Sequence, residues 1–260
     1  MSYPKMKGKH SETPIITPKE YVRYSKKVGI TPLQMPTNIV LCFSERLIDS
    51  LQERHELKVV SGIYDHSTTK LCSVGGTNGR VGILSNFGIG APATVLHMEE
   101  LIAWGAKRFV VLGTAGGINA DLQAGDVVVC TKSIRDEGTS HHYTKNTRYS
   151  SASRELTDAL FEAFSKDVRR LYKGPSWTID APYRETVKEL IHYRSEGVMT
   201  VEMEASAVFA VGQIRGVETS AVFVISDLLT ENGWKPSIHS ATVLAKLVIV
   251  FQSVRKVLAI

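Results

Sequence analysis

The chain has 260 residues, of which 43% are hydrophobic and 22% charged, and it carries a formal net charge of +5 at pH 7. This size and apolar content predict a globular protein with one sizeable core, and a single α/β domain of this length is ordinary. The positive charge alone does not indicate nucleic-acid binding, because basic and acidic residues are interleaved and the basic stretch 5–27 has few aromatic side chains for stacking.

The two ends of the chain and its cysteines indicate in which cellular compartment the protein is expected to reside. Residues 1–12 are polar and basic without an apolar segment behind them, which argues against a secretory signal. Residues 241–260 are apolar but interrupted by three basic residues, so we expect a core helix and no membrane contact. Cys42, Cys72 and Cys130 show no disulfide or metal-binding spacing, which favours the cytoplasm and predicts no metal site.

Strands and helices are predicted to alternate along most of the chain. Residues 1–36 are expected to form a tail with a short helix at 18–27, and residues 37–260 a single domain. Strands are predicted at 38–43, 71–74, 81–87, 109–112, 126–131 and 220–225. Helices are predicted at 44–53, up to Gly105, and at 151–168, 184–193, 203–214 and 237–258. Asn78-Gly79 favours positive φ and so predicts a hairpin turn between the second and third strands.

This alternation predicts a parallel or mixed sheet with helices on both faces. Sites in such sheets lie at the carboxyl ends of the strands. Segments 88–92, 113–117 and 226–227 each follow a predicted strand directly. We therefore expect these three segments to meet at one edge of the sheet.

The most informative segment is Gly-Thr-Ala-Gly-Gly at 113–117, which we predict to be a loop. It lacks the endings of the known phosphate and dinucleotide loops, so a tight strand exit is an equally good interpretation. The hydroxyl of Thr114 with exposed amides would make an anion cradle. Gly88-Ile89-Gly90 repeats the arrangement one strand earlier, which strengthens the functional interpretation.

Three carboxylates are candidates for chemistry. Glu202 and Glu204 flank Met203, and one carboxylate can accept hydrogen bonds from both hydroxyls of a vicinal diol. The alternative is a pair of solvated glutamates at a helix start. Asp227 follows a buried strand, where it either caps the next helix or delivers a proton.

The polar loops at 136–143 and 178–186 are less specific. Arg184 in the second loop could recognise a planar carbonyl or ring nitrogen, or the loop could simply lead into a helix at Pro182. His142 in the first loop is expected to be structural, and the loop itself is either a lid or a surface turn.

From about Asn38 to the C-terminus, these segments together resemble the nucleoside phosphorylase family, which includes uridine phosphorylase and hexameric purine nucleoside phosphorylase. The resemblance implies an α/β fold with a single domain whose mixed, partly barrel-like central sheet is flanked by helices. It implies a pentosyltransferase that uses phosphate to release a free base and ribose 1-phosphate in nucleoside salvage. It further implies phosphate as co-substrate, no metal or organic cofactor, and a homo-oligomer built from dimers, commonly a hexamer.

The resemblance also assigns roles to residues. Asp227 would be the catalytic acid, and its presence favours purines over uracil, as does Pro182, which occupies the position of a uracil-recognising glutamine. The remaining roles are phosphate binding by Arg46, Gly113 and Thr114, ribose binding by Thr114, Glu202, Met203 and Glu204, and base binding by Arg184, Ala115 and Gly116.

Two departures from the family pattern keep alternatives open. Cys42 replaces a phosphate-contacting glycine and Val111 a phosphate-binding arginine, for which Arg108 is no obvious substitute because it faces the other side of its strand. No arginine stands near residues 62–64 to serve a neighbouring subunit. The alternatives are a uridine phosphorylase, a nucleosidase that uses water, and a non-catalytic nucleoside-binding protein.

Overall fold

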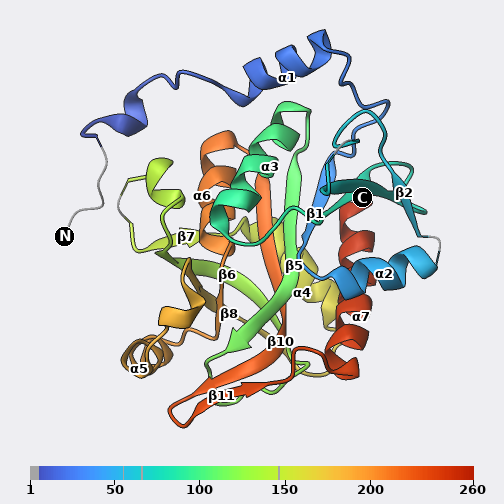
Figure 1. The fold of residues 1–260 in the computed structure, drawn as a ribbon. Coiled ribbons are helices and arrows are strands. Elements are labelled where there is room, and N and C mark those ends of the chain that lie inside the picture. Colours follow the sequence, from blue (N-terminus) through green and yellow to red (C-terminus); the bar gives the residue numbers. More distant parts are fainter. Residues whose placement is uncertain (1–5, 55, 66, 146) are drawn as a thin grey trace.

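A computed structural model describes residues 6–54, 56–65, 67–145 and 147–260 (Figure 1). Its described strands form one mixed sheet in the order β11-β10-β6-β8-β9-β5-β1-β4-β3-β2, with β7 beside β6. A further parallel pairing between β10 (Glu218–Thr230) and β5 (Arg108–Gly117) closes part of this sheet into a barrel. The predicted α/β fold with a mixed, partly barrel-like sheet is confirmed.

Strand β1 (Asn38–Cys42) shows why helices cover both faces of the sheet. All five of its residues are buried between β4 (Val81–Ser85) and β5, and alternate side chains enter two different cores. One core packs against α2 (Glu45–Glu53), α4 (Arg154–Phe164) and α7 (Ala241–Leu258). The other packs against α3 (Ala91–Ala103) and α6 (Ala205–Arg215), which lie side by side in Figure 1.

The N-terminal helix α1 (Pro18–Lys27) coincides with the predicted helix at 18–27. Thr17 and Glu20 form a reciprocal capping box at its start. The helix lies beyond α3 at the top of Figure 1, with Lys26 Nζ 5.2 Å from the ring centre of Trp104. Residues 1–5 of the predicted tail lie outside the described residues.

Two other local predictions are confirmed. Strand β3 (Lys70–Val74) pairs with β4 as an antiparallel hairpin, and Asn78 and Gly79 in its turn have φ of 50° and 72°. The Ser44 side chain accepts a hydrogen bond from Leu47 N at the start of α2. Strand β2 (Leu57–Val59), on the outer edge of β3, was not predicted.

The glycine segment at 113–117 is not a loop, and this prediction was wrong. β5 continues through it, paired with β10 on one side and with β9 (Thr200–Glu202) on the other. A Cβ at Gly116 would lie 2.5 Å from Leu229 Cδ1, and one at Gly117 would lie 2.9 Å from Leu228 Cδ2. The glycines are therefore required by the close approach of β10 where the barrel closes.

The barrel also contains a strand that the sequence did not predict. β8 (Leu171–Ile179) pairs in parallel with β6 (Val127–Asp136), although Gly174 and Pro175 argue against a strand. The register shifts between Cys130 and Ser133 of β6, opposite this Gly-Pro pair, so an irregularity accommodates it. The short strands β7 (Tyr149–Ser151), β9 and β11 (Gly233–Pro236) were missed as well.

The C-terminal helices begin later than predicted, because the preceding residues act as caps or strands. α4 begins at Arg154 and α7 at Ala241, each after a serine N-cap. Arg184 ends a short 3-10 helix, η3 (Pro182–Arg184), and α5 (Val187–Ser195) follows a capping box formed by Thr186 and Glu189. Glu204 is the N-cap residue of α6.

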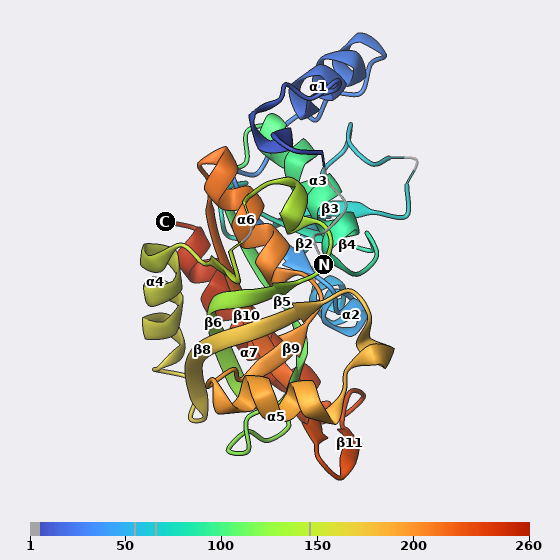
Figure 2. The same ribbon diagram turned by 90° about the vertical axis from the view of Figure 1, so that its left-hand side faces the viewer.

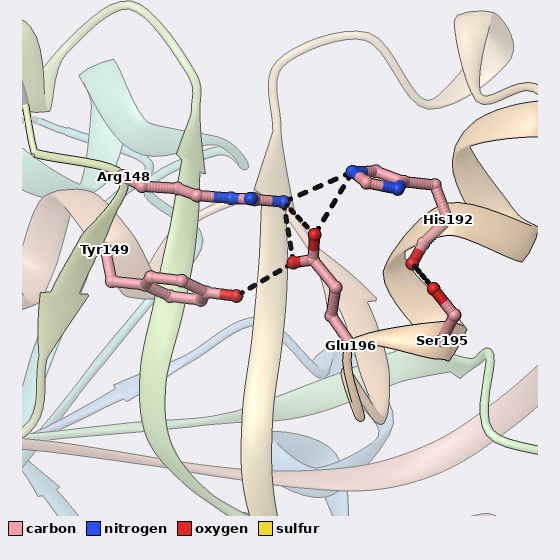
Figure 3. Close-up of polar contacts among 5 residues, drawn as sticks. All are labelled: Arg148, Tyr149, His192, Ser195 and Glu196. Carbon is pink, nitrogen blue, oxygen red and sulfur yellow. Dashed lines mark hydrogen bonds and ion pairs between the residues drawn. The ribbon is translucent and has the colours of Figure 1, made fainter.

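A polar cluster fastens the end of α5 to β7 (Figure 3). Arg148 Nη2 donates to both carboxylate oxygens of Glu196, at 2.7 and 2.6 Å. His192 Nε2 lies 3.1 Å from Glu196 Oε1, and the Tyr149 hydroxyl donates to Oε2 at 3.3 Å. The cluster thus joins the C-terminal end of α5 to β7, which pairs with β6 of the barrel.

Within the described part of the chain, no helix has the length and apolar character needed to cross a bilayer. The same residues contain no group of three or more His, Cys, Asp or Glu side chains arranged to hold a metal ion.

Candidate active site

A cavity of about 340 Å³ lies where β1 and β4 end, beside Thr114 of β5. The loop after β1, the first turn of α2, the residues after β4, and the start of α7 form its walls. Its lining includes Cys42, Ser44, Glu45, Arg46, Ser85, Asn86, Gly88, Thr114 and His239. Arg46 and Thr114, both predicted to contact phosphate, thus face one cavity although they are distant in sequence.

Gly113, the third predicted phosphate residue, does not line this cavity. It is buried within β5, and a Cβ there would lie 3.5 Å from the Phe43 ring. Cys42 does line the cavity. Burial raises the pKa of its thiol to about 12, so Cys42 is neutral at physiological pH.

Two cavity residues, Asn86 and His239, were not singled out from the sequence. Asn86 adopts a left-handed conformation with φ of 56°, which small polar residues tolerate best. His239 lies just before α7, whose N-terminal turn closes one side of the cavity. A lone histidine in a polar stretch carries no sequence signal, so only the fold reveals its position.

Glu202 is the more deeply engaged of the paired carboxylates. Its side chain is 6% exposed, and its Oε2 accepts from the backbone N–H groups of Glu204 and Ala205, each at 2.7 Å. Three hydroxyls surround its Oε1: Ser133 at 3.2 Å, Ser176 at 3.1 Å and Thr178 at 2.6 Å. Burial raises the pKa of Glu202 and these hydrogen bonds oppose the rise. Glu202 thereby fixes the start of α6.

Glu204 joins α6 to the glycine turn before α3. Its Oε1 accepts from Gly90 N at 2.7 Å and its Oε2 from Met203 N at 3.2 Å. Burial, assisted by the negative charge of Glu202, raises the pKa of Glu204 to about 8. Gly88, in the same turn, lines the cavity, so this turn connects Glu204 to the cavity lining. The Met203 methyl group lies 3.9 Å from the position that a Cβ on Gly90 would occupy.

Asp227 is part of strand β10 and does not cap a helix, which removes the simpler of its two interpretations. Its Oδ1 accepts from Ser226 Oγ at 2.6 Å and its Oδ2 from Trp234 Nε1 at 2.8 Å. A register shift between Ile225 and Asp227 places a β-bulge at this point. Bulges of this kind re-aim side chains beside active sites.

Strand β5 brings the distant segments together. Gly116 is paired with Asp227 on one side and with Val201, the neighbour of Glu202, on the other. Thr114 lies two residues earlier on the same strand. Of the three segments predicted to meet, 226–227 pairs with 113–117 in the sheet, and Gly88 of segment 88–92 lines one cavity with Thr114. Glu204 and Asp227 do not line this 340 Å³ cavity.

The residues predicted to bind the base are less closely gathered. Arg184 is exposed on η3, whereas Ala115 and Gly116 are buried in β5. The adjacent Glu185 is half-buried, and its pKa is raised to about 7 by burial and then by the charges of Asp227 and Glu189. Asp227 therefore acts electrostatically on Glu185, the residue that follows Arg184.

The sequence profile of the family described as the phosphorylase superfamily matches residues 39–257. A guanosine phosphorylase from Halorubrum lacusprofundi is 27% identical over 195 residues, which cover 75% of this chain and 74% of that protein. A uridine phosphorylase from Treponema pallidum is 32% identical over 151 residues, covering 53% of this chain and 58% of that protein. The chain thus spans less than two thirds of the second relative.

Solved structures show the same fold. A uridine phosphorylase from Vibrio fischeri superposes with a TM-score of 0.74 at 19% identity, covering 86% of this chain and 92% of that one. An AMP nucleosidase from Bacteroides thetaiotaomicron superposes with a TM-score of 0.72 at 21% identity, covering 91% and 97%.

Proposed function

The chain belongs to the phosphorylase superfamily, and from this premise we propose that it is a nucleoside phosphorylase, a pentosyltransferase that prefers purine ribonucleosides. The reaction would break the N-glycosidic bond with inorganic phosphate and give a free base and ribose 1-phosphate. The observation that carries the proposal is the arrangement around β5. A cavity of about 340 Å³ is lined by Arg46 and Thr114, the buried Glu204 binds the glycine turn that contributes Gly88 to its wall, and Asp227 lies on the strand next to β5.

Phosphate would occupy the cavity. Arg46 lies in the first turn of α2, and a helix N-terminus favours an anion through its free N–H groups and its dipole. Thr114 and the Ser85 hydroxyl add neutral hydrogen-bonding groups to the lining. Each hydrogen bond between phosphate and a charged donor would contribute about 1.5–3 kcal/mol.

The sugar would lie against the turn that contains Gly90. Glu204 is held there by two backbone N–H groups and keeps capacity for the ribose hydroxyls, while Met203 packs beside it. Both oxygens of Glu202 already have protein partners. Glu202 would therefore act indirectly, by accepting the backbone N–H groups of Glu204 and Ala205 and so fixing the position of Glu204.

The base would leave towards Asp227. Cleavage through an oxocarbenium-like state needs negative charge near the sugar and a proton or hydrogen bond on the departing base. Phosphate supplies the first and Asp227 the second. Arg184, Ala115 and Gly116 would form the surroundings of the base.

Hydrolysis is the second candidate, and a specific observation favours it. Val111, at the position of a family arginine, is fully buried, and Arg108 at the far end of β5 is paired with Glu218 at 2.6 Å. Cys42 contributes only a neutral thiol. The cavity therefore has fewer cations for phosphate than the family pattern provides, although His239 faces it as well.

Several further properties belong to the proposal. We expect a cytoplasmic salvage enzyme with phosphate as co-substrate and no other cofactor, assembled from dimers, commonly as a hexamer. Size-exclusion chromatography with light scattering would measure the assembly, and a strictly monomeric active enzyme would contradict it.

The reaction is tested by incubating the protein with inosine, adenosine, guanosine and uridine, each with and without phosphate. We expect base release from purine nucleosides only with phosphate, together with ribose 1-phosphate. Base release without phosphate would establish the nucleosidase alternative, and cleavage of uridine alone would overturn the purine preference. Tight binding without any base release would favour a non-catalytic role.

A further inference from the structure

The β10–β11 hairpin places an indole on the proposed catalytic acid. β11 pairs antiparallel with β10, with Trp234 opposite Leu229 and Pro236 opposite Asp227. The Trp234 ring reaches back along the ladder so that Nε1–H donates to Asp227 Oδ2 at 2.8 Å. The hairpin protrudes at the lower end of Figures 1 and 2, the end to which β5 points.

The hydrogen bond to Asp227 is the feature of the Trp234 side chain that calls for an explanation. Trp234 is 60% exposed, so core packing does not explain why its N–H meets a carboxylate. The same oxygen, Asp227 Oδ2, lies 3.3 Å from the position that a Cβ on Gly116 would occupy. The carboxylate is thus held between a bare stretch of β5 and an indole from the hairpin.

The two oxygens of Asp227 have chemically different partners. Indole N–H is a donor only, so Oδ2 is the acceptor in this contact and Trp234 offers no acceptor for a proton on the carboxyl group. The Ser226 hydroxyl, 2.6 Å from Oδ1, can donate or accept, and the Ala115 carbonyl oxygen lies 3.5 Å from it as a second acceptor. Of the two oxygens, Oδ1 is therefore the one whose described partner, the Ser226 hydroxyl, can exchange the roles of donor and acceptor.

We propose that Trp234 is a positioning residue that fixes the orientation of the Asp227 carboxyl group by holding Oδ2, so that Oδ1 is the oxygen that delivers a proton to the purine base. The inference rests on the proposed function. In the step itself, the O–H bond at Oδ1 breaks as a purine ring nitrogen takes the proton. The glycosidic electron pair passes to the base, and phosphate forms the new bond to the sugar carbon. Ser226 then donates to the carboxylate oxygen that remains.

The test compares inosine with 7-methylinosine, whose base already carries positive charge and leaves without a proton. Trp234→Phe keeps an aromatic ring but removes the N–H. We expect kcat for inosine to fall about tenfold or more, while kcat for 7-methylinosine stays within about twofold and KM for both is unchanged. Trp104→Phe is the matched control. Trp104 is the C-cap residue of α3 and packs against Lys26, and its replacement should leave the kinetics of both substrates unchanged.

Activity on 7-methylinosine also shows that the Trp234→Phe site is folded. An equal fall with both substrates, or no fall with inosine, would overturn the inference. So would a wild-type enzyme that cleaves inosine but not 7-methylinosine, because base protonation would then not be the step that Asp227 serves. A wild-type enzyme that releases no base from inosine, adenosine or guanosine would instead refute the proposed function.

Discussion

Glu204 is the residue in which binding and stability are most closely linked. Its carboxyl group is buried beside the charge of Glu202, and its pKa is raised from 4.5 to about 8. Between these two values the folded protein holds a proton that the unfolded chain has released. The contribution of Glu204 to the free energy of unfolding therefore decreases as pH rises through this interval.

We expect Glu204→Gln to remove this part of the pH dependence. Its melting temperature should fall less steeply than that of the wild type between pH 5 and pH 8, as measured by calorimetry. Glu162→Gln, a change at an exposed glutamate on α4, is the control and should keep the wild-type slope. Identical slopes for all three proteins would contradict the assigned protonation of Glu204.

Loss of the Glu204 side chain should reduce catalytic activity more than it reduces the stability of the fold. In Glu204→Ala we expect kcat/KM for a purine nucleoside to fall about 10- to 100-fold, as when a buried hydrogen-bonding group is left without its partner. Steady-state kinetics and a melting curve measure the two effects separately. Normal activity in a folded Glu204→Ala protein would refute the sugar-binding role.

At the scale of the element, β5 carries the connection between fold and site. Its last residues are small because β10 approaches closely where the barrel closes. The same closeness brings Asp227 beside the strand that holds Thr114. A side chain added at one of the last glycines of β5 should therefore disturb both the packing of the barrel and the candidate site.

Gly116→Ala tests this connection. The new Cβ would meet Leu229 Cδ1 at 2.5 Å and Asp227 Oδ2 at 3.3 Å, so both side chains must shift. We expect a loss of about 1–3 kcal/mol of stability in urea unfolding, as for other overpacked positions. The accompanying loss of activity should exceed that of Gly76→Ala, at an exposed turn where a Cβ meets no atom within 4 Å. Gly76→Ala carries its own strain from a φ of +72°, so unfolding is measured for both variants.

The polar cluster between α5 and β7, centred on Arg148 and Glu196, can be tested in the same way. Arg148→Ala removes the donor to both oxygens of Glu196. Because the pair is partly exposed, we expect little change in melting temperature but faster hydrogen exchange of the α5 amides, with a smaller difference at high salt. Unchanged exchange in α5 at low salt would show that hydrophobic packing alone holds this helix.

At the scale of the whole molecule, phosphate should stabilise the fold. A ligand that binds only the folded protein raises its stability by about 2.7 kcal/mol at a concentration of 100 times Kd. For a chain of this size, the melting temperature should rise by about 5–10 °C. Potassium chloride at equal ionic strength controls for screening. The rise should shrink in Arg46→Ala, and an equal rise in that variant would place phosphate elsewhere.

Local sequence patterns determined a large part of this fold. The buried run of β1, the Asn-Gly turn between β3 and β4, the Ser44 cap of α2 and the helix α1 all depend on neighbouring residues, and all were predicted. The order of strands and helices led to a mixed sheet with a site at its carboxyl edge. Short-range physics of this kind, namely side-chain periodicity, capping and turn conformation, is legible in a single sequence.

Tertiary structure decided what depended on distant partners. The segment 113–117 is a strand because β10 and β9 hydrogen-bond to it, and β8 tolerates Gly174-Pro175 because an irregularity in its pairing with β6 accommodates the pair. His239 faces the cavity, and Trp234 reaches Asp227, only once the chain has folded. Strand pairing and barrel closure join residues far apart in the chain, and local propensity contains no information about those contacts.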